Sequence, residues 1–212
     1  MAQGRFITFE GGEGAGKSTQ LKRLAARLQA GGREVVATRE PGGSPGAEGI
    51  RELVLNGAAD RWSPVTETLL MYAARRDHVE RVIRPALACG AWVVCDRFAD
   101  STRAYQGAAG GTDPALIAAL ETYILEDTRP DLTLIFDLPA AVGLKRAHAR
   151  AGGAEMRFES KGEAFHERLR AGFLAIAAAE PARCAVVDAT GAPGEVEARV
   201  WAAVEGRLAV HG

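Results

Sequence analysis

The sequence is poor in cysteine, has no excess of either charge and contains no long apolar run. Its three cysteines, Cys89, Cys95 and Cys184, are far apart and lack the close spacing of a zinc or dithiol site. We therefore expect them to be core residues of a reduced, intracellular protein. Lys and Arg total 26 against 27 Asp and Glu, so the net charge of −1 gives no general electrostatic reason to bind a nucleic-acid polymer.

Targeting and linker signals are also missing. Residues 1–10 lack the basic and then apolar regions of a signal peptide, and no stretch approaches the ~20 apolar residues of a membrane span. We therefore expect a cytoplasmic protein with no membrane partner. No internal repeat or Pro/Ser-rich linker divides the chain, which predicts one domain over residues 1–212.

Short apolar runs alternate with helical patterns along the chain. The runs lie at 6–9, 34–37, 92–95, 132–136 and 185–187, and the helical patterns at 17–30, 46–57, 65–88, 114–125, 140–150, 163–179 and 194–208. The runs lack strict alternation, so helices should cover both faces of the sheet. This order predicts an α/β fold with a five-stranded parallel sheet flanked by helices. The polar, Gly-containing segment 150–163 lacks periodicity and is expected to be a flexible lid.

A glycine-rich segment follows the first apolar run and fits the pattern G-x-x-x-x-G-K-[ST]. The residues expected to bind nucleotide are Gly11, Gly12, Glu13, Gly14, Ala15, Gly16, Lys17, Ser18 and Thr19. Backbone N–H groups of such a loop wrap phosphate oxygens, Lys17 can neutralise their charge and Ser18 can ligate Mg²⁺. The alternative is a chance Gly-rich turn, but the segment lies between an apolar strand and an amphipathic helix, as a phosphate-binding loop does.

Five motifs, in order over nearly the whole chain, resemble those of the thymidylate kinase family. They are the segments 9–19, 38–43, 96–98, Ser101 with 104–107, and 187–190. The resemblance implies the three-layer fold of P-loop nucleoside monophosphate kinases. It also implies ATP as phosphoryl donor with Mg²⁺, dTMP as acceptor, dTDP as product in dTTP biosynthesis, and a homodimer formed through long helices such as 65–88.

Asp96 and Arg97 follow the third apolar run and should emerge at the carboxyl end of a parallel strand, where open α/β sheets bind ligands. Arg97 can hold the acceptor phosphate, and Asp96 can hold Mg²⁺ together with Ser18. The alternative is an ordinary solvated ion pair. Phosphoryl transfer to a phosphate requires no general base, so the catalytic work expected of the protein is positioning and charge neutralisation.

The resemblance also implies further acceptor-site residues. It places Arg39 and Arg51 near the monophosphate, although Arg39 could instead be a surface charge paired with Glu40. Around the base and sugar it places Met71, Arg75, Ser101, Tyr105 and Gln106. Met71 stands where the family has a stacking aromatic, so it either contacts the base or lies in the helix core. Arg75 offers a fixed donor fork to a thymine carbonyl.

The loop itself indicates which catalytic variant of the family the chain resembles. Some members carry Asp-Arg where this sequence has Glu13-Gly14, so another cation must meet the charge on the transferring phosphoryl group. The resemblance assigns this role to the lid, with Arg150 the best match and Arg157 the next. A solvated basic helix end is the alternative. Glu13 is expected to engage the sugar 3′-hydroxyl.

Three rival interpretations stay open at this point. One is a kinase for another nucleoside monophosphate. A GTP-dependent switch is disfavoured, because such proteins use Asn-Lys-x-Asp and the one asparagine here, Asn56, precedes Gly57. A P-loop protein that binds nucleotide without catalysis is disfavoured by Lys17, Ser18 and Arg97.

The resemblance also implies that segment 187–190 contacts the adenine of ATP; the alternative is that Asp188 caps a helix.

Overall fold

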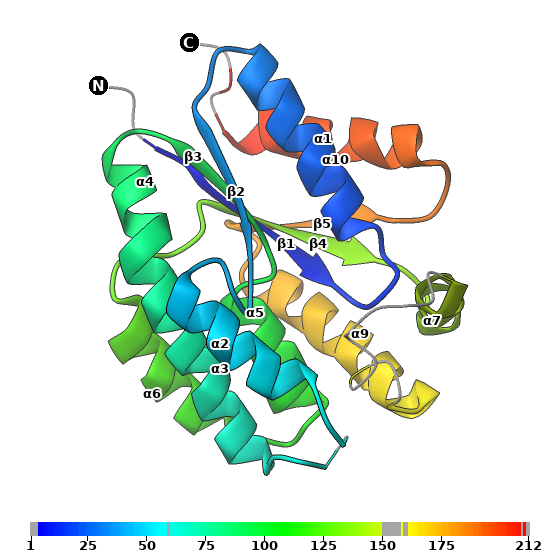
Figure 1. Ribbon diagram of the computed structural model, residues 1–212. Coiled ribbons are helices and arrows are strands. Elements are labelled where there is room, and N and C mark those ends of the chain that lie inside the picture. The colour runs from blue at the N-terminus through cyan, green and yellow to red at the C-terminus, as the bar shows by residue number, and fades with distance from the viewer. Residues whose placement is uncertain (1–3, 59, 150–157, 159–160, 209, 211–212) are drawn as a thin grey trace.

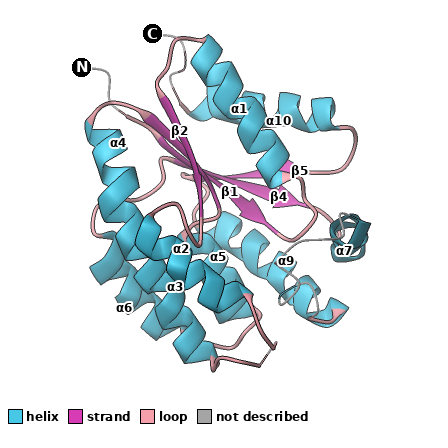
Figure 2. Ribbon diagram, viewed as in Figure 1, coloured by secondary structure: helices cyan, strands magenta, loops and turns pink. Residues whose placement is uncertain are grey.

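The computed structural model describes residues 4–58, 60–149, 158, 161–208 and 210. Its centre is a parallel sheet of five strands in the order β2-β3-β1-β4-β5 (Figures 1 and 2). The strands are β1 (Phe6–Gly11), β2 (Val35–Arg39), β3 (Trp92–Asp96), β4 (Leu132–Asp137) and β5 (Cys184–Asp188). The predicted sheet is therefore confirmed, with each strand one to two residues longer than its apolar run suggested.

Helices form a layer on each face of this sheet. The helical elements are α1 (Lys17–Ala30), α2 (Pro45–Leu55), α3 (Pro64–His78), η1 (Val79–Ile83), α4 (Arg84–Ala88), α5 (Ala99–Thr102), η2 (Arg103–Ala108), α6 (Pro114–Leu125), α7 (Ala140–Ala149), α9 (Glu163–Ala179) and α10 (Pro193–Arg207). Helices α1 and α10 lie on one face, and most of the others lie across the opposite face (Figure 1). The result is the three-layer P-loop kinase fold.

Strand β1 shows why the sheet sequences lack alternation. Ile7 and Phe9 pack into the core beneath α1 and α10, whereas Phe6 packs into a second core with Val79 and Ile83 of η1. All of these side chains are fully buried, because both faces of the sheet are covered.

The predicted helix over 65–88 is present but has three parts. Helix α3 continues into η1, a π-helical turn, and then into α4, with helical backbone angles at both junctions. Pro85 lies in the first turn of α4 and has no N–H to donate to the carbonyl four residues earlier, which favours a local change of helical pitch there.

Two sequence expectations are wrong or incomplete. Cys89 is exposed, whereas Cys95 and Cys184 are buried, so only two of the three cysteines are core residues. The apolar run around Cys89 ends at Gly90, where the chain turns out of α4 toward β3. The short helical element formed by α5 and η2 is not among the helical patterns recognised along the sequence, because many of its buried residues are polar and conceal its helical period. None of the described helices combines the length and apolarity needed to cross a membrane.

Candidate active site

The phosphate-binding loop joins β1 to α1. Gly11 has φ 131° and Gly16 has φ 85°, conformations that residues with a side chain rarely adopt. Lys17 Nζ donates to the carbonyls of Gly11 at 3.0 Å and Gly12 at 2.8 Å. Burial, and then the charge of Arg97, lower the pKa of Lys17 to about 8. A phosphate bound beside Lys17 would raise this pKa again, because a nearby negative charge stabilises the protonated amine.

Ser18 and Asp96 meet beside the loop. Ser18 is the second residue of α1, and Asp96 is the last residue of β3. Ser18 Oγ donates to Asp96 Oδ2 at 2.5 Å. A hydroxyl and a carboxylate are hard oxygen donors, the kind that Mg²⁺ prefers. The pair that sequence reasoning assigned to the metal is therefore brought together, and its chemistry fits.

Arg97 lies in a left-handed backbone conformation, with φ 69°. Such a conformation is unfavourable for a residue with a side chain and is kept only when neighbours hold it. The Cys95 thiol donates to the Arg97 carbonyl at 3.0 Å, while the guanidinium donates to Gly11 O at 3.0 Å and to Glu13 Oε1 at 2.8 Å. These contacts aim the fork of Arg97 across the phosphate-binding loop.

Glu13 is the carboxylate that faces these cations. Burial alone would raise the pKa of Glu13, but the charges of Arg97 and Lys17 outweigh it and hold the pKa near 2. Tyr105 adds a hydrogen bond from its hydroxyl at 2.5 Å. Glu13 is therefore a fixed anion at neutral pH, with its oxygens oriented by the surrounding groups.

A cavity with about 570 Å³ of empty space, part of it open to solvent, lies beside this cluster. It is lined by eight of the residues that sequence analysis assigned to the acceptor site, namely Glu13, Arg51, Met71, Arg75, Arg97, Ser101, Tyr105 and Gln106. Ser101, Tyr105 and Gln106 come from α5 and η2, and all three face the cavity. Gln106 also donates to Glu67 at 2.9 Å.

Arg39 is not among the residues that line the cavity. Its side chain is 53% exposed and donates to both carboxylate oxygens of Glu48 at 3.0 Å. Among the described contacts, its charged partner is therefore Glu48 and not Glu40. The reason is the strand: side chains alternate between the two sides of β2, and the next residue, Glu40, is the one that turns inward.

Arg75 is almost completely buried in the cavity wall. Nε donates to Glu40 Oε2 at 2.8 Å, and Nη2 donates to Phe98 O at 2.9 Å and Thr102 Oγ1 at 3.1 Å. Nη1 is buried and has no hydrogen-bond partner among the described residues. A guanidinium has five N–H donors, and the two on Nη1 are the ones that these contacts leave unused.

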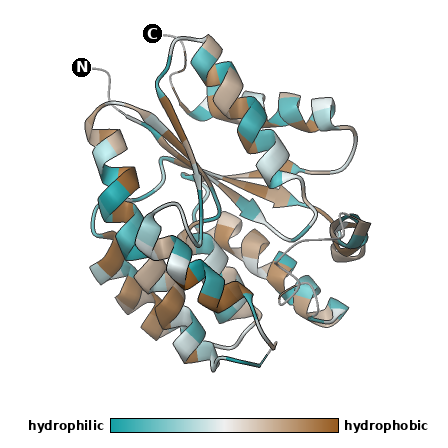
Figure 3. Cartoon of the chain, viewed as in Figure 1, coloured by the Kyte–Doolittle hydropathy of each residue, from teal (hydrophilic) through white to brown (hydrophobic). Residues whose placement is uncertain are grey.

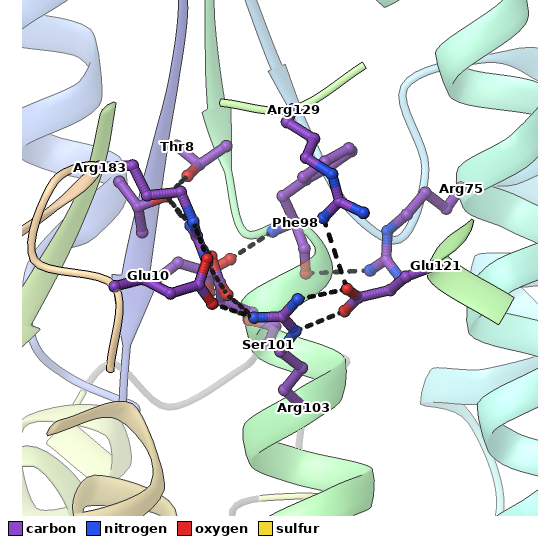
Figure 4. A network of polar contacts seen from close by, with 12 residues as sticks. Thr8, Glu10, Arg75, Phe98, Ser101, Arg103, Glu121, Arg129 and Arg183 are labelled. Carbon is purple, nitrogen blue, oxygen red and sulfur yellow. Dashed lines mark hydrogen bonds and ion pairs between the residues drawn. The ribbon is translucent and has the colours of Figure 1, made fainter. Parts of the chain in front are cut away.

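Glu10 is a site residue that sequence analysis missed (Figure 4). Its carboxyl is fully buried and accepts from Phe98 N at 2.7 Å and from Ser101 Oγ at 2.6 Å. Burial, and then the nearby charge of Asp100, raise the pKa of Glu10 to about 8. The available signal was an acidic residue inside an otherwise apolar strand, a position that is costly unless the group has partners.

Beside Glu10 lies a partly buried network of charged side chains that the sequence did not predict (Figure 4). Arg183 donates to both carboxylate oxygens of Asp100, at 2.7 and 2.8 Å. Arg103 reaches from η2 to Glu121 on α6 and to Glu180 after α9. The network ties the element that carries Ser101 and Tyr105 to three other parts of the fold.

The segment predicted to seat adenine follows β5. Asp188 accepts from the backbone N–H and the hydroxyl of Thr190, at 2.9 and 2.6 Å. Helix α10 begins later, with Ala192 at its N-cap. Asp188 therefore closes a turn and does not cap the helix.

The phosphate-binding loop and α7 touch through glycines. A Cβ on Gly14 would lie 2.0 Å from the carbonyl oxygen of Gly143, and a Cβ on Gly143 would lie 2.4 Å from Glu13 O. Position 14 therefore has no room for the arginine found there in other members of the resembled family. Arg150 and Arg157, the expected substitutes, lie outside the described residues.

Comparison with known proteins decides the family. Residues 9–200 match the family model for thymidylate kinase. The chain belongs to the thymidylate kinase family. It is therefore a phosphotransferase that moves the γ-phosphoryl group of ATP to dTMP, giving dTDP for dTTP biosynthesis.

Individual relatives agree with this assignment over nearly the full length. The chain is 69% identical to thymidylate kinase of Caulobacter vibrioides over 208 residues, which cover 98% of this chain and 99% of that protein. It is 56% identical to thymidylate kinase of Bradyrhizobium diazoefficiens, over 97% and 91% of the two chains. The crystal structure of thymidylate kinase from Ehrlichia chaffeensis matches with a TM-score of 0.76 and 35% identity, over 94% and 98% of the chains.

Proposed function

We propose that the cavity beside the phosphate-binding loop is the dTMP site and that Arg75 reads the base within it. The observation that carries this proposal is the buried Nη1 of Arg75, whose two donors have no partner among the described residues. Thymine presents carbonyl oxygens, which accept hydrogen bonds. Cytosine presents an amino group where thymine has its second carbonyl, so with a cytosine base the N–H donors of Arg75 would face another donor and no hydrogen bond would form.

Other residues of the cavity are assigned by their contacts. Arg97 donates to Gly11 O and to Glu13, both in the phosphate-binding loop. This position is suited to hold the acceptor phosphate in line with the donor. Glu13, as a fixed carboxylate, accepts from the sugar 3′-hydroxyl. Arg51 lines the cavity and donates to Pro41 O at 2.7 Å, leaving its charge near the acceptor. Met71 lies against the base in place of an aromatic ring.

On the donor side, Lys17 and the loop amides hold the phosphates of ATP. Ser18 and Asp96 would hold Mg²⁺, which would neutralise phosphate charge and orient the transferring group. Arg150 supplies the cation that the loop cannot, a role supported by the close contact of Gly14 with α7. Since ATP and the dTTP pathway belong to the cytoplasm, we place the enzyme there.

We also propose a homodimer formed through α2, α3 and α6, which lie side by side (Figure 1). Four large hydrophobic side chains on these helices are exposed, namely Leu53, Val65, Leu69 and Tyr123. Val65 and Leu69 are four residues apart on α3 and so share one face of that helix. Helix α6 is among the most hydrophobic helices of the chain (Figure 3). A second copy of the chain would cover these side chains.

Base selectivity tests the role of Arg75. We expect kcat/KM for dTMP to exceed that for dCMP by ~10⁴-fold, because a polar site built for one hydrogen-bond pattern leaves its buried donors unpaired with the other. Discrimination against dUMP should be milder, ~10–200-fold, since it rests on one methyl group. Arg75→Met should abolish most of the dTMP/dCMP discrimination. Steady-state kinetics with the three nucleotides measure this, and equal use of dCMP by the wild-type enzyme would refute the assignment.

A further inference from the structure

The segment Thr38–Gly43 turns its inward side chains toward α3. Thr38 and Glu40 face α3, whereas Arg39, between them, pairs with Glu48 at the surface. Gly43 has φ 89°, and a Cβ there would lie 2.5 Å from His78 Nε2. The absence of a side chain at Gly43 therefore makes room for the His78 ring.

Glu40 is the centre of a buried chain of contacts. Its Oε2 accepts from Arg75 Nε at 2.8 Å, and its Oε1 lies 2.9 Å from His78 Nδ1. His78 Nε2 lies 2.7 Å from Thr38 Oγ1. Because a carboxylate only accepts, Nδ1 is the nitrogen of His78 that donates to Glu40. Glu40, Arg75 and His78 are all nearly or fully excluded from solvent.

The guanidinium of Arg75 is consequently held from two sides. Glu40 takes Nε, and Phe98 O and Thr102 Oγ1 take the two donors of Nη2, which leaves only Nη1. The charge of Glu40 also matters, since a buried arginine without a counter-ion is strongly unfavourable. Burial alone would lower the pKa of Arg75, and the charge of Glu40 leads the opposing effects that raise it.

We infer that Glu40 is a specificity-determining positioning residue. His78, which itself contacts Thr38, holds Glu40 in place, and Glu40 orients the guanidinium of Arg75. In this orientation Nη1 donates to a pyrimidine carbonyl and cannot pair with an amino group. This inference rests on the proposed role of Arg75 as the base reader. It also gives the conspicuous motif at 38–43 a task other than phosphate binding by Arg39. Without the carboxylate, the guanidinium loses its charged partner and one of its three hydrogen bonds within the wall, so Nη1 is held less firmly toward a carbonyl.

Glu40→Gln keeps the size of the side chain but removes its charge. We expect the ratio of kcat/KM for dTMP to kcat/KM for dCMP to fall at least ~10-fold, through a higher KM for dTMP, while the KM for ATP stays unchanged. A merely structural role would lower the active fraction and so reduce kcat equally for both nucleotides. An unchanged ratio in folded Glu40→Gln would overturn the inference.

Three further variants keep the test decisive. If Glu40→Gln does not fold, Glu40→Asp keeps the charge but retracts the carboxylate by one methylene, so a lowered ratio supports the inference and a wild-type ratio overturns it. Glu80→Gln is the matched control, because Glu80 of η1 pairs at the surface with Arg76 of α3, and its ratio should stay at the wild-type value. Arg75→Met separates the two proposals: an unchanged ratio there refutes the base reader itself, whereas a lowered ratio with unaffected Glu40 variants refutes only the inference.

Discussion

At the scale of single residues, Lys17 has a pKa close enough to neutrality to affect activity in an accessible pH range. Its pKa of about 8 belongs to the protein without ATP, and bound phosphates should raise it. Loss of the proton removes a positive charge, so ATP binding weakens as pH rises. We expect kcat/KM for ATP to fall ~10-fold for each pH unit above about 8, whereas kcat at saturating ATP falls only at higher pH. Initial rates at fixed, saturating dTMP from pH 6.5 to 10 measure both profiles.

Glu10 is the necessary control, because its pKa is also about 8. Glu10→Gln cannot ionise; its one oxygen can still accept from Phe98 N, and its NH₂ group can donate to the Ser101 hydroxyl. If Lys17 causes the basic limb of the profile, Glu10→Gln should keep it. Disappearance of the limb in this variant would assign the ionisation to Glu10 and contradict the prediction.

At the scale of elements, the contact between the phosphate-binding loop and α7 leaves no room for an arginine at position 14, which supports the proposal that Arg150 supplies the cation. Arg150→Ala should lower kcat by ~10³-fold or more, as loss of an arginine finger does, because a cation that acts in the transition state contributes to kcat. The KM for ATP should change little. Single-turnover and steady-state kinetics with dTMP test this, and wild-type kcat in Arg150→Ala would remove the residue from the mechanism.

The same contact predicts that an arginine in the loop cannot take over this role. Gly14 has φ 69°, and any side chain there meets the Gly143 carbonyl oxygen. The double variant Gly14→Arg with Arg150→Ala should therefore be no faster than Arg150→Ala alone. Recovery of kcat in the double variant would show that α7 moves aside, contrary to the packing described above.

At the scale of the whole molecule, the exposed hydrophobic side chains of α2, α3 and α6 predict a dimer. Tyr123 is 77% exposed, and a charge there would be buried without a partner in the assembled dimer. Tyr123→Glu should raise the dimer dissociation constant at least ~100-fold, as loss of a central aromatic contact does. Sedimentation velocity over a range of protein concentrations measures the constant.

Val186 supplies the matched substitution for this test. It is a hydrophobic residue that is 52% exposed on β5, an edge strand away from α2, α3 and α6. Val186→Glu should leave the dissociation constant unchanged. A monomeric wild-type protein, or equal effects of the two substitutions, would contradict the proposed interface.

The sequence alone determined the parts of this protein that depend on local geometry. A loop that wraps phosphate requires glycines at left-handed positions and a lysine at a fixed distance from them, so the segment from Gly11 to Lys17 could be recognised directly. The strands could be predicted because burial on both faces demands apolar residues. Asp96 and Arg97 could be placed because parallel strands end at one edge of the sheet.

Only the tertiary structure decided which charged groups meet. Glu40 and Arg75 lie 35 residues apart, and Glu10 and Ser101 lie 91 residues apart, so no periodicity connects them. Packing brings them together because a buried charge or polar group is tolerated only beside a partner. The resemblance implied Arg39 near the acceptor phosphate, with a surface charge as the alternative, whereas the alternation of β2 leaves Arg39 paired with Glu48 at the surface and turns Glu40 inward.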